Sequence, residues 1–247
     1  MIGILDSGIG GVTVLNHIRK LLKHQHFIYY SDSKNNPYGE KPEQEIYDMV
    51  KNIVEYLIQK GCQTIVIACN TASAICSSRL RKEYPTIRII AIEPALKVVK
   101  DRQYKGLTLV LATSATLKSQ KFLNTYQKYK TEQTVLVPCK GLANDIEENN
   151  QEKINEFLQN LKKEYPETKN IVLGCTHYPL IQNRILEYFK EVNFFDGGIG
   201  VSRLLQKEIQ DKNQKEVIEF IDSSESIEKQ NRFYNYINNE NKEIKKS

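Results

Sequence analysis

Two stretches of this sequence place a cysteine directly after a run of apolar residues. TIVIACNTAS carries Cys69 and NIVLGCTHYP carries Cys175, and polar side chains follow both thiols at once. A thiol in such a position can exchange a proton, attack an electrophile or bind a soft metal. A cysteine that serves only as a small core side chain is the alternative, and we favour it for Cys62 and Cys76.

The apolar runs before both cysteines belong to a longer alternation of strands and helices. Residues 12–23 and 43–61 have apolar side chains at helical spacing. This alternation is typical of parallel sheets with helices on both faces, and ligands bind beyond the carboxyl ends of such strands. The expected strands are residues 3–6, 27–32, 64–69, 87–92, 107–113, 134–139, 170–175 and 192–198.

The strands form two series that resemble an internal duplication. Asp6 ends the first strand of one series, 63 residues before Cys69, and Thr113 ends the matching strand of the other, 62 residues before Cys175. We therefore expect an α/β fold of two pseudo-symmetric lobes, each a mainly parallel sheet flanked by helices, with the active site in the cleft between them. The expected boundaries assign residues 1–93 and 198–247 to the Cys69 lobe and residues 94–197 to the Cys175 lobe.

Composition excludes several classes of protein. The chain has 247 residues, of which 40% are hydrophobic and 26% charged, as in ordinary globular proteins. It has no apolar run near the ~20 residues that cross a bilayer, so no membrane partner is expected. A net charge of +5, spread over scattered lysines, predicts no nucleic-acid partner. Five cysteines without a CxxC pair, and an N-terminus without an export signal, indicate a reducing cytoplasm.

The sequence does not fit a dinucleotide-binding loop or a structural zinc site. The SGIGG segment after the first strand is similar to a dinucleotide-binding loop, but Thr13 stands where the third glycine belongs. Cys69, Cys175 and His177 form an incomplete ligand set for a structural zinc site, which has four ligands in paired spacings. We therefore expect neither a bound metal nor a nucleotide.

Six segments carry a resemblance to a known family. They are DSGIGG (6–11), PYGEK (37–41), ACNTAS (68–73), EPA (93–95), ATSAT (112–116) and LGCTHYPL (173–180). In this order and spacing they resemble the glutamate racemases of the cofactor-independent Asp/Glu racemase family, over nearly the whole chain. The CTHYP segment is typical of the glutamate branch. Lys34 and Asn35 stand where Ala-Arg is common in the family, so the packing of that loop or an interface is expected to differ.

The resemblance implies a two-base racemisation that needs no cofactor. An α-proton leaves one face of the amino acid and a proton returns to the other, so two acid/base groups, one on each face, suit the reaction. Cys69 is expected to take the proton from D-glutamate and Cys175 from L-glutamate. Asp6 is the expected auxiliary group beside Cys69, and His177, with Glu147, is the expected partner of Cys175.

The resemblance also implies how the substrate is bound. Hydroxyl, amide and backbone donors would hold its carboxylates as negative charge develops. The expected substrate-binding residues are Asp6, Ser7, Tyr38, Gly39, Asn70, Thr71, Thr113, Thr116, Thr176 and His177. A small-molecule substrate, glutamate, a role in supplying D-glutamate for peptidoglycan, and a homodimer are the further expectations.

Three alternatives remain open at this point. One is a racemase of aspartate or of another small acidic amino acid. The second is a hydrolase that uses Cys175 as nucleophile and His177 as base. The third is a binding protein on a racemase scaffold that has lost its activity. Exchange of the α-proton of glutamate with solvent deuterium separates a racemase from the last two.

Overall fold

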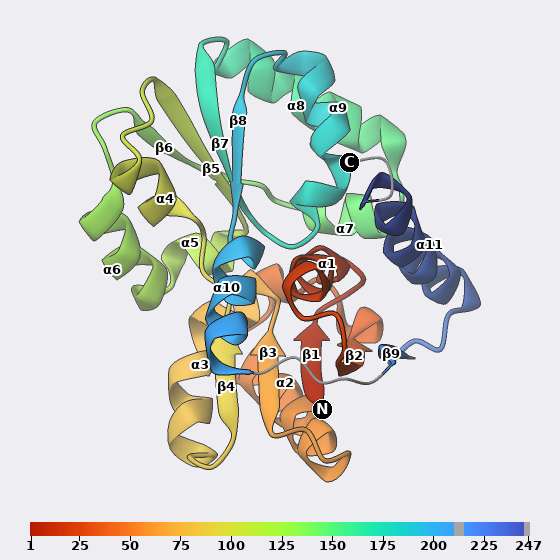
Figure 1. Cartoon of the computed structure of the whole chain (residues 1–247). Coiled ribbons are helices and arrows are strands. Elements are labelled where there is room, and N and C mark those ends of the chain that lie inside the picture. Colours follow the sequence, from red (N-terminus) through yellow and green to blue (C-terminus); the bar gives the residue numbers. More distant parts are fainter. Residues whose placement is uncertain (210–214, 245–247) are drawn as a thin grey trace.

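Two parallel sheets, each with helices on both faces, make up the fold (Figure 1). The computed structural model describes the backbone of residues 1–209 and 215–244, with side chains as far as residue 238. The first sheet and its helices form the first lobe, and the second sheet and its helices form the second lobe. The expected two-lobed α/β fold is confirmed.

The first sheet has five parallel strands in the order β4-β3-β1-β2-β9. Its strands are β1 (Ile2–Asp6), β2 (His26–Ser31), β3 (Thr64–Ile67), β4 (Arg88–Ala91) and β9 (Val217–Asp222). Its helices are α1 (Val12–Leu21), α2 (Glu43–Gln59), α3 (Asn70–Glu83), α10 (Gly198–Glu208) and α11 (Ile227–Ile244).

The second sheet has four parallel strands in the order β6-β5-β7-β8. Its strands are β5 (Leu107–Ala112), β6 (Thr134–Pro138), β7 (Thr168–Gly174) and β8 (Asn193–Asp196). Its helices are α4 (Leu96–Asp101), α5 (Ser114–Lys118), α6 (Gln120–Tyr129), α7 (Leu142–Glu147), α8 (Gln151–Glu164) and α9 (Gln182–Tyr188).

The strand orders of the two sheets correspond. β4-β3-β1-β2 of the first sheet matches β8-β7-β5-β6 of the second, so β1 and β5 are equivalent, as are β3 and β7. Strands β3 and β7 are the ones that lead into Cys69 and Cys175. The first sheet differs by carrying β9 beside β2. The duplicated pattern of the sequence thus corresponds to a duplicated topology, with the two cysteines at equivalent strand ends.

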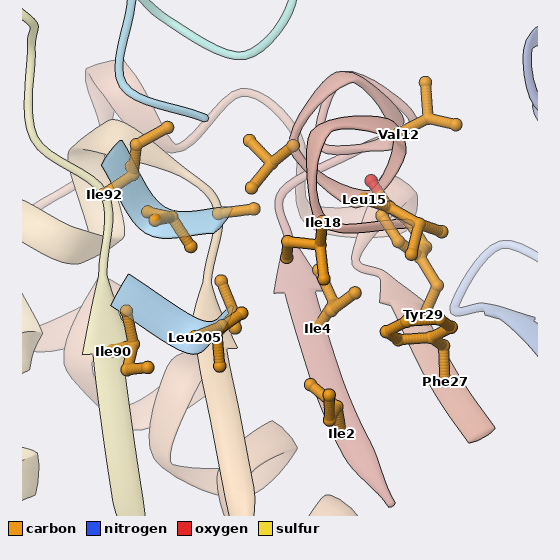
Figure 2. Close-up of a cluster of buried hydrophobic side chains, with 14 of the residues drawn as sticks. Ile2, Ile4, Val12, Leu15, Ile18, Phe27, Tyr29, Ile90, Ile92 and Leu205 are labelled. Atoms are coloured by element: carbon orange, nitrogen blue, oxygen red, sulfur yellow. The ribbon is translucent and has the colours of Figure 1, made fainter. Parts of the chain in front are cut away.

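Apolar side chains cover both faces of the first sheet because successive strand residues point to opposite faces. On one face Ile4 packs in a cluster with Leu15 of α1 and Leu205 of α10 (Figure 2). Phe233 of α11 belongs to the same cluster. On the other face Leu5 packs with residues of α2 and α3. Burial on both faces explains the continuous apolar runs of these strands. Their carboxyl ends are the places where polar side chains begin.

Two elements of the first lobe, β9 and α11, are not predicted by the sequence analysis. β9 pairs in parallel with β2 at the edge of the sheet, and α11 packs against α1 and β9. The expected lobe boundaries, between residues 93 and 94 and between residues 197 and 198, stay a prediction. Residues 210–214 and 245–247 of the expected first lobe lie outside the described residues. Within the described part of the chain, no helix is both long and apolar enough to span a membrane.

Candidate active site

Cys69 and Cys175 each lie directly beyond the carboxyl end of a strand, in different lobes. Cys69 follows β3 and is the N-cap residue of α3, whereas Cys175 follows β7. Both side chains are buried, with 5% and 8% of their surface exposed. Cys62 and Cys76 lie in the hydrophobic cluster between the first sheet, α2 and α3, as expected for core side chains. Cys69 belongs to the same cluster and Cys175 to that of the second lobe, but both lie at strand ends with polar neighbours.

The surroundings of Cys69 keep its thiol protonated. Burial, together with the nearby Asp6 carboxylate and Cys175, raises the pKa of Cys69 to about 12. The backbone N–H of Ala72 and the hydroxyl of Ser7 act in the opposite direction, because both donate hydrogen bonds to the sulfur. The electrostatic influence of Cys175 on Cys69 is consistent with thiols of the two lobes that lie near each other.

Cys175 has a different partner. Its Sγ lies 3.8 Å from Nδ1 of His177, and Nε2 of the same ring lies 2.7 Å from Oε2 of Glu147. Burial opposes a charge on His177, but its hydrogen bonds to Cys175 and Glu147 outweigh burial and raise the pKa of His177 well above its usual value. The Cys175 sulfur thus lies within hydrogen-bond distance of a protonated imidazole.

Glu147 is a buried carboxylate that stays ionised. Burial favours its neutral form, but the hydrogen bond and charge of His177, followed by the charge of Lys229, lower the pKa of Glu147 to about 2. Oε2 also accepts a hydrogen bond from the backbone N–H of Ile9, at 3.1 Å. The structure thus brings Glu147 to His177, while its neighbour Glu148 is exposed.

Asp6 joins the two lobes at the end of β1. Its Oδ2 accepts a hydrogen bond from the backbone N–H of Gly11 at 3.0 Å, and its Oδ1 accepts one from the hydroxyl of Thr176 at 3.1 Å. Burial raises the pKa of Asp6 to about 6, against the opposing influence of His177. Asp6 therefore changes its charge close to neutral pH, beside Cys69.

The loop after β1 lies so close to the second lobe that it has no room for side chains at two positions. A Cβ at Gly8 would lie 2.6 Å from Oε2 of Glu147. A Cβ at Gly10 would lie 2.7 Å from Nδ1 of His177 and 2.8 Å from its backbone N. The glycines that are similar to a dinucleotide loop in sequence therefore serve the contact between the lobes.

Several expected substrate-binding residues adjoin the two thiols. The Ser7 hydroxyl donates to Cys69, whereas Asn70 and Thr176 directly follow Cys69 and Cys175 in the chain. Thr71 Oγ1 lies 2.9 Å from Thr113 Oγ1 and 3.3 Å from Thr116 Oγ1, which links α3 to α5 across the lobes.

Tyr38 and Gly39 lie at the edge of this set. The Tyr38 ring is buried in the cluster that contains Cys69, and its hydroxyl donates to Oδ2 of Asp32 at 2.5 Å. Gly39 lies against Thr113, since a Cβ at Gly39 would be 2.8 Å from Cβ of Thr113. The Tyr38 hydroxyl is thus hydrogen-bonded to Asp32, and the backbone at Gly39 is the part of this segment that lies against Thr113.

Asn70 offers an acceptor to a ligand. Its Oδ1 is buried and has no hydrogen-bond partner among the residues that the structure describes. Buried polar atoms are nearly always paired, so such an atom calls for a partner from outside the chain. Asn70 follows Cys69 in the chain, so that partner would sit beside the thiol.

Sequence reasoning missed three residues that contact the site. Ser33 donates to Oε1 of Glu147 at 3.3 Å, Lys229 Nζ lies 3.5 Å from the same oxygen, and Tyr29 donates to the backbone oxygen of Gly8 at 2.8 Å. The position of Ser33 just beyond the end of β2 is a signal that could have identified it. Nothing distinguishes Lys229 in the sequence from the other lysines near the C-terminus.

The histidine, cysteine and carboxylate side chains of this site are of the types that bind metal ions. Among the residues with described positions, no group of three or more such side chains is arranged to hold a metal ion. The contacts above are hydrogen bonds and ion pairs between the groups themselves. What the arrangement can do is move protons between two thiols and their partners.

Comparison with known proteins gives a consistent result. The family model described as Asp/Glu/Hydantoin racemase matches residues 2–199. A glutamate racemase from Clostridium perfringens is 42% identical over 220 residues, which cover 87% of this chain and 85% of that one. The crystal structure of glutamate racemase from Campylobacter jejuni matches with a TM-score of 0.81 and 25% identity, over 96% of this chain and 98% of that one. A glutamate racemase from Francisella tularensis, in complex with D-glutamate, matches with a TM-score of 0.80 and 25% identity, over 96% and 93% of the two chains.

Proposed function

Because this chain belongs to the Asp/Glu/Hydantoin racemase family, we propose that it interconverts L- and D-glutamate with two cysteines as acid/base groups. The relatives and structural neighbours make it an amino-acid racemase, an isomerase. Glutamate as the substrate is supported by the relatives' activity and by the D-glutamate bound in the Francisella enzyme. The observation that carries the proposal is the pair of thiols, one at the end of β3 and one at the end of β7, each with its own acid/base partner.

The two thiols have different partners. The protonated ring of His177 lies beside Cys175, whereas the raised pKa of Cys69, about 12, keeps a thiol there. With L-glutamate bound between them, the Cys175 thiolate takes the α-proton and becomes a thiol. The Cys69 thiol then gives its proton to the opposite face of the carbanion, which forms D-glutamate. The reverse reaction runs through the same groups in the opposite order.

The auxiliary groups serve this cycle on both sides. His177 stays close to Cys175 because Glu147 holds its other nitrogen. Asp6, whose pKa is about 6, is the proposed auxiliary group at Cys69. In this proposal the protein's own side chains move every proton, so no cofactor takes part.

The substrate contacts in this proposal come from both lobes. Hydroxyl and amide donors of Ser7, Asn70, Thr71 and Thr176, with the backbone near Tyr38 and Gly39, would bind the carboxylates. Thr113 and Thr116 would complete the set. The unpaired Oδ1 of Asn70 would accept a hydrogen bond from the substrate ammonium. Donors aimed at a carboxylate as charge develops stabilise the carbanion in a site that excludes water.

Access to this site requires the lobes to separate. Both thiols are buried, with 5% and 8% exposed, and groups of both lobes cover them. The proposed moving units are residues 1–93 with 198–247, and residues 94–197. Closure around the substrate would then exclude water and bring the two thiols to opposite faces of the α-carbon.

The proposed setting follows from the same family membership. We place the enzyme in the cytoplasm, where it supplies D-glutamate for peptidoglycan. The proposed assembly is a homodimer. Three exposed apolar side chains, Val98, Ile199 and Leu204, gather around one surface hollow and support a contact with a second copy. Analytical ultracentrifugation of the purified chain tests this, and a single species with the mass of one chain would contradict it.

Exchange of the α-proton in deuterated water tests the proposed reaction. L-Glutamate incubated with the protein should gain deuterium at Cα and lose optical activity, and D-glutamate should do the same. Aspartate in parallel reactions identifies the substrate, because a faster reaction with aspartate would replace glutamate in the proposal. A protein that binds glutamate or hydrolyses another substrate without exchanging the α-proton would overturn it.

A further inference from the structure

Helix α11 of the first lobe reaches across to helix α7 of the second. The helix is anchored in the core of the first lobe by Phe233 and Ile237. Two residues of its N-terminal half, Lys229 and Arg232, contact the end of α7. They are three residues apart, so they project from the same side of α11.

The two cations contact the end of α7 at different atoms. Nζ of Lys229 lies 3.5 Å from Oε1 of Glu147 and 3.5 Å from Oε1 of the exposed Glu148, and the Lys229 side chain is only 15% exposed. Arg232 donates to the backbone oxygen of Ile146 at 3.1 Å and also to the backbone oxygen of Glu147. The last carbonyl groups of a helix have no partner within it, and cationic side chains satisfy them there. Lys229 thus contacts the Glu147 side chain, and Arg232 fixes the backbone that carries it.

The contacts of the Glu147 carboxylate can be assigned to one lobe or the other. Oε1 also accepts from the hydroxyl of Ser33, and Oε2 accepts from the backbone N–H of Ile9. These two groups and Lys229 all belong to the first lobe. His177 is the contact that belongs to the second lobe. The first lobe therefore holds the carboxylate that in turn orients the histidine beside Cys175.

We propose that Lys229 and Arg232 are positioning residues for the Cys175 half of the racemisation. They hold Glu147 where it keeps the His177 ring turned with Nδ1 toward Cys175. This inference rests on the proposed function for its kinetic consequence. The arrangement also links the chemistry to closure of the cleft, because the carboxylate is fully coordinated only when α11 and α7 are together.

The charge of Lys229 matters as well as its position. Glu147 is buried, and a buried carboxylate is stable only when charges and donors compensate for the lost water. Removal of the cation leaves the carboxylate with less compensation, and its contact with His177 is then less firmly fixed. A small displacement of a catalytic group can slow a reaction by roughly 100-fold. The effect should be greater at Cys175 than at Cys69, since His177, which Glu147 orients, contacts Cys175.

The test compares Lys229→Met and Lys229→Arg with a matched control, Lys153→Met. Lys153 lies 3.8 Å from Asp145 on the same helix α7, but it is 64% exposed and does not contact Glu147. Lys229→Met should lower kcat about tenfold or more and change KM less than about threefold, because the substrate contacts remain. Lys229→Arg should restore most of the wild-type kcat. Lys153→Met should have the same kcat and KM as the wild type.

A second measurement does not depend on glutamate turnover. Iodoacetamide alkylation, resolved by peptide mass spectrometry, gives the ratio of the rates at Cys175 and Cys69. Opening of the lobes affects both thiols, so the ratio reports the state of Cys175. Lys229→Met and Arg232→Met should lower this ratio about tenfold or more while thermal unfolding stays cooperative. If Lys229→Met does not fold, Lys229→Gln is measured instead, since it removes the charge and keeps a donor.

The outcomes separate this inference from the proposed function. Folded Lys229 variants with an unchanged kcat and an unchanged alkylation ratio would overturn it. An equal loss of the ratio in Lys153→Met would also overturn it, because the effect would then be one of general surface charge. A wild-type protein that does not exchange the α-proton of glutamate contradicts the proposed function alone. The alkylation ratio still decides the role of Lys229 in that case.

Discussion

Glu147 and His177 form an ion pair with both side chains almost entirely enclosed by protein, with Nε2 2.7 Å from Oε2. Glu147 comes from the end of α7, and His177 from the loop after β7. A buried ion pair contributes little net stability, because the lost hydration offsets the attraction. Its role here is orientation, because it leaves Nδ1 of the ring toward Cys175.

Glu147→Gln should slow racemisation by at least about tenfold, because the neutral amide no longer holds a protonated His177 in place. It should also lower the free energy of unfolding by about 3 kcal/mol, since a buried cation loses its partner. Glu148→Gln is the control. Glu148 is 58% exposed, so the free energy of unfolding of Glu148→Gln should stay within about 0.5 kcal/mol of wild type. Kinetics and urea unfolding measure both, and equal effects of the two substitutions would refute the assignment of Glu147.

Cys69→Ser and Cys175→Ser should each lower kcat for both enantiomers by at least about 100-fold, because every cycle uses both thiols. A hydroxyl is a far weaker acid than a thiol and does not replace it. Cys62→Ala, in the core of the first lobe, is the control and should keep its activity. Polarimetry from either enantiomer gives the rates. Near-normal turnover in either serine variant would contradict the two-thiol mechanism.

Gly10→Ala should reduce activity by about 100-fold, because its methyl group would push the first loop away from His177 and Thr176. The contact with the His177 backbone N, at 2.8 Å, cannot be relieved by a side-chain rotation. Gly200→Ala provides the comparison, since no atom lies within 4 Å of a Cβ there. Gly200 lies inside α10, so alanine should leave activity unchanged and add up to about 1 kcal/mol of stability. Racemisation rates and thermal unfolding of both variants check this.

Asp6→Asn should change the pH dependence of stability. Burial raises the pKa of Asp6 to about 6 in the folded protein, whereas an unfolded chain has a value of about 3.9. The folded state therefore binds this proton more tightly, and the resulting stability is full below about pH 4 and is lost as the pH rises through about 6. A pKa difference of about two corresponds to about 3 kcal/mol.

Asparagine does not ionise, so the Asp6→Asn variant lacks this dependence. The free energy of unfolding of the variant, relative to wild type, should therefore rise by about 3 kcal/mol between pH 4 and pH 7. Urea unfolding at several pH values measures the difference. A difference that stays constant over this range would show that Asp6 does not titrate as the structure indicates.

The carboxyl ends of β3 and β7 are the part of the site that the sequence predicted most directly. The apolar runs before Cys69 and Cys175 indicate buried parallel strands, and the residue after such a strand lies at the edge where ligands bind. His177 follows because it is two residues from Cys175 in the same loop. Asp6 is the last residue of β1, so it too lies at the carboxyl end of a parallel strand.

Other parts of the fold gave weaker signals. The β9 segment, VIEFID, alternates exposed and half-buried residues and lies at a sheet edge, so it lacks the continuous apolar run of the other strands. Helix α11 has a polar sequence, with Phe233 and Ile237 as its buried side chains in the first-lobe core. Neither segment has enough apolar character for its position to be predicted from its own sequence.

The sequence by itself predicted two lobes, the strands β1 to β8 and the polar residues at the ends of those strands, because periodicity marks each strand and repeated spacings relate the two series. Only the tertiary structure showed the contact of Glu147 with His177, and that Ser33 and Lys229 hold the Glu147 carboxylate. Those contacts join segments more than 80 residues apart in the case of Lys229. The local sequence pattern shows which face of a helix is apolar. The contact of Lys229 with the buried Glu147 carboxylate instead depends on how α11 packs against the other lobe.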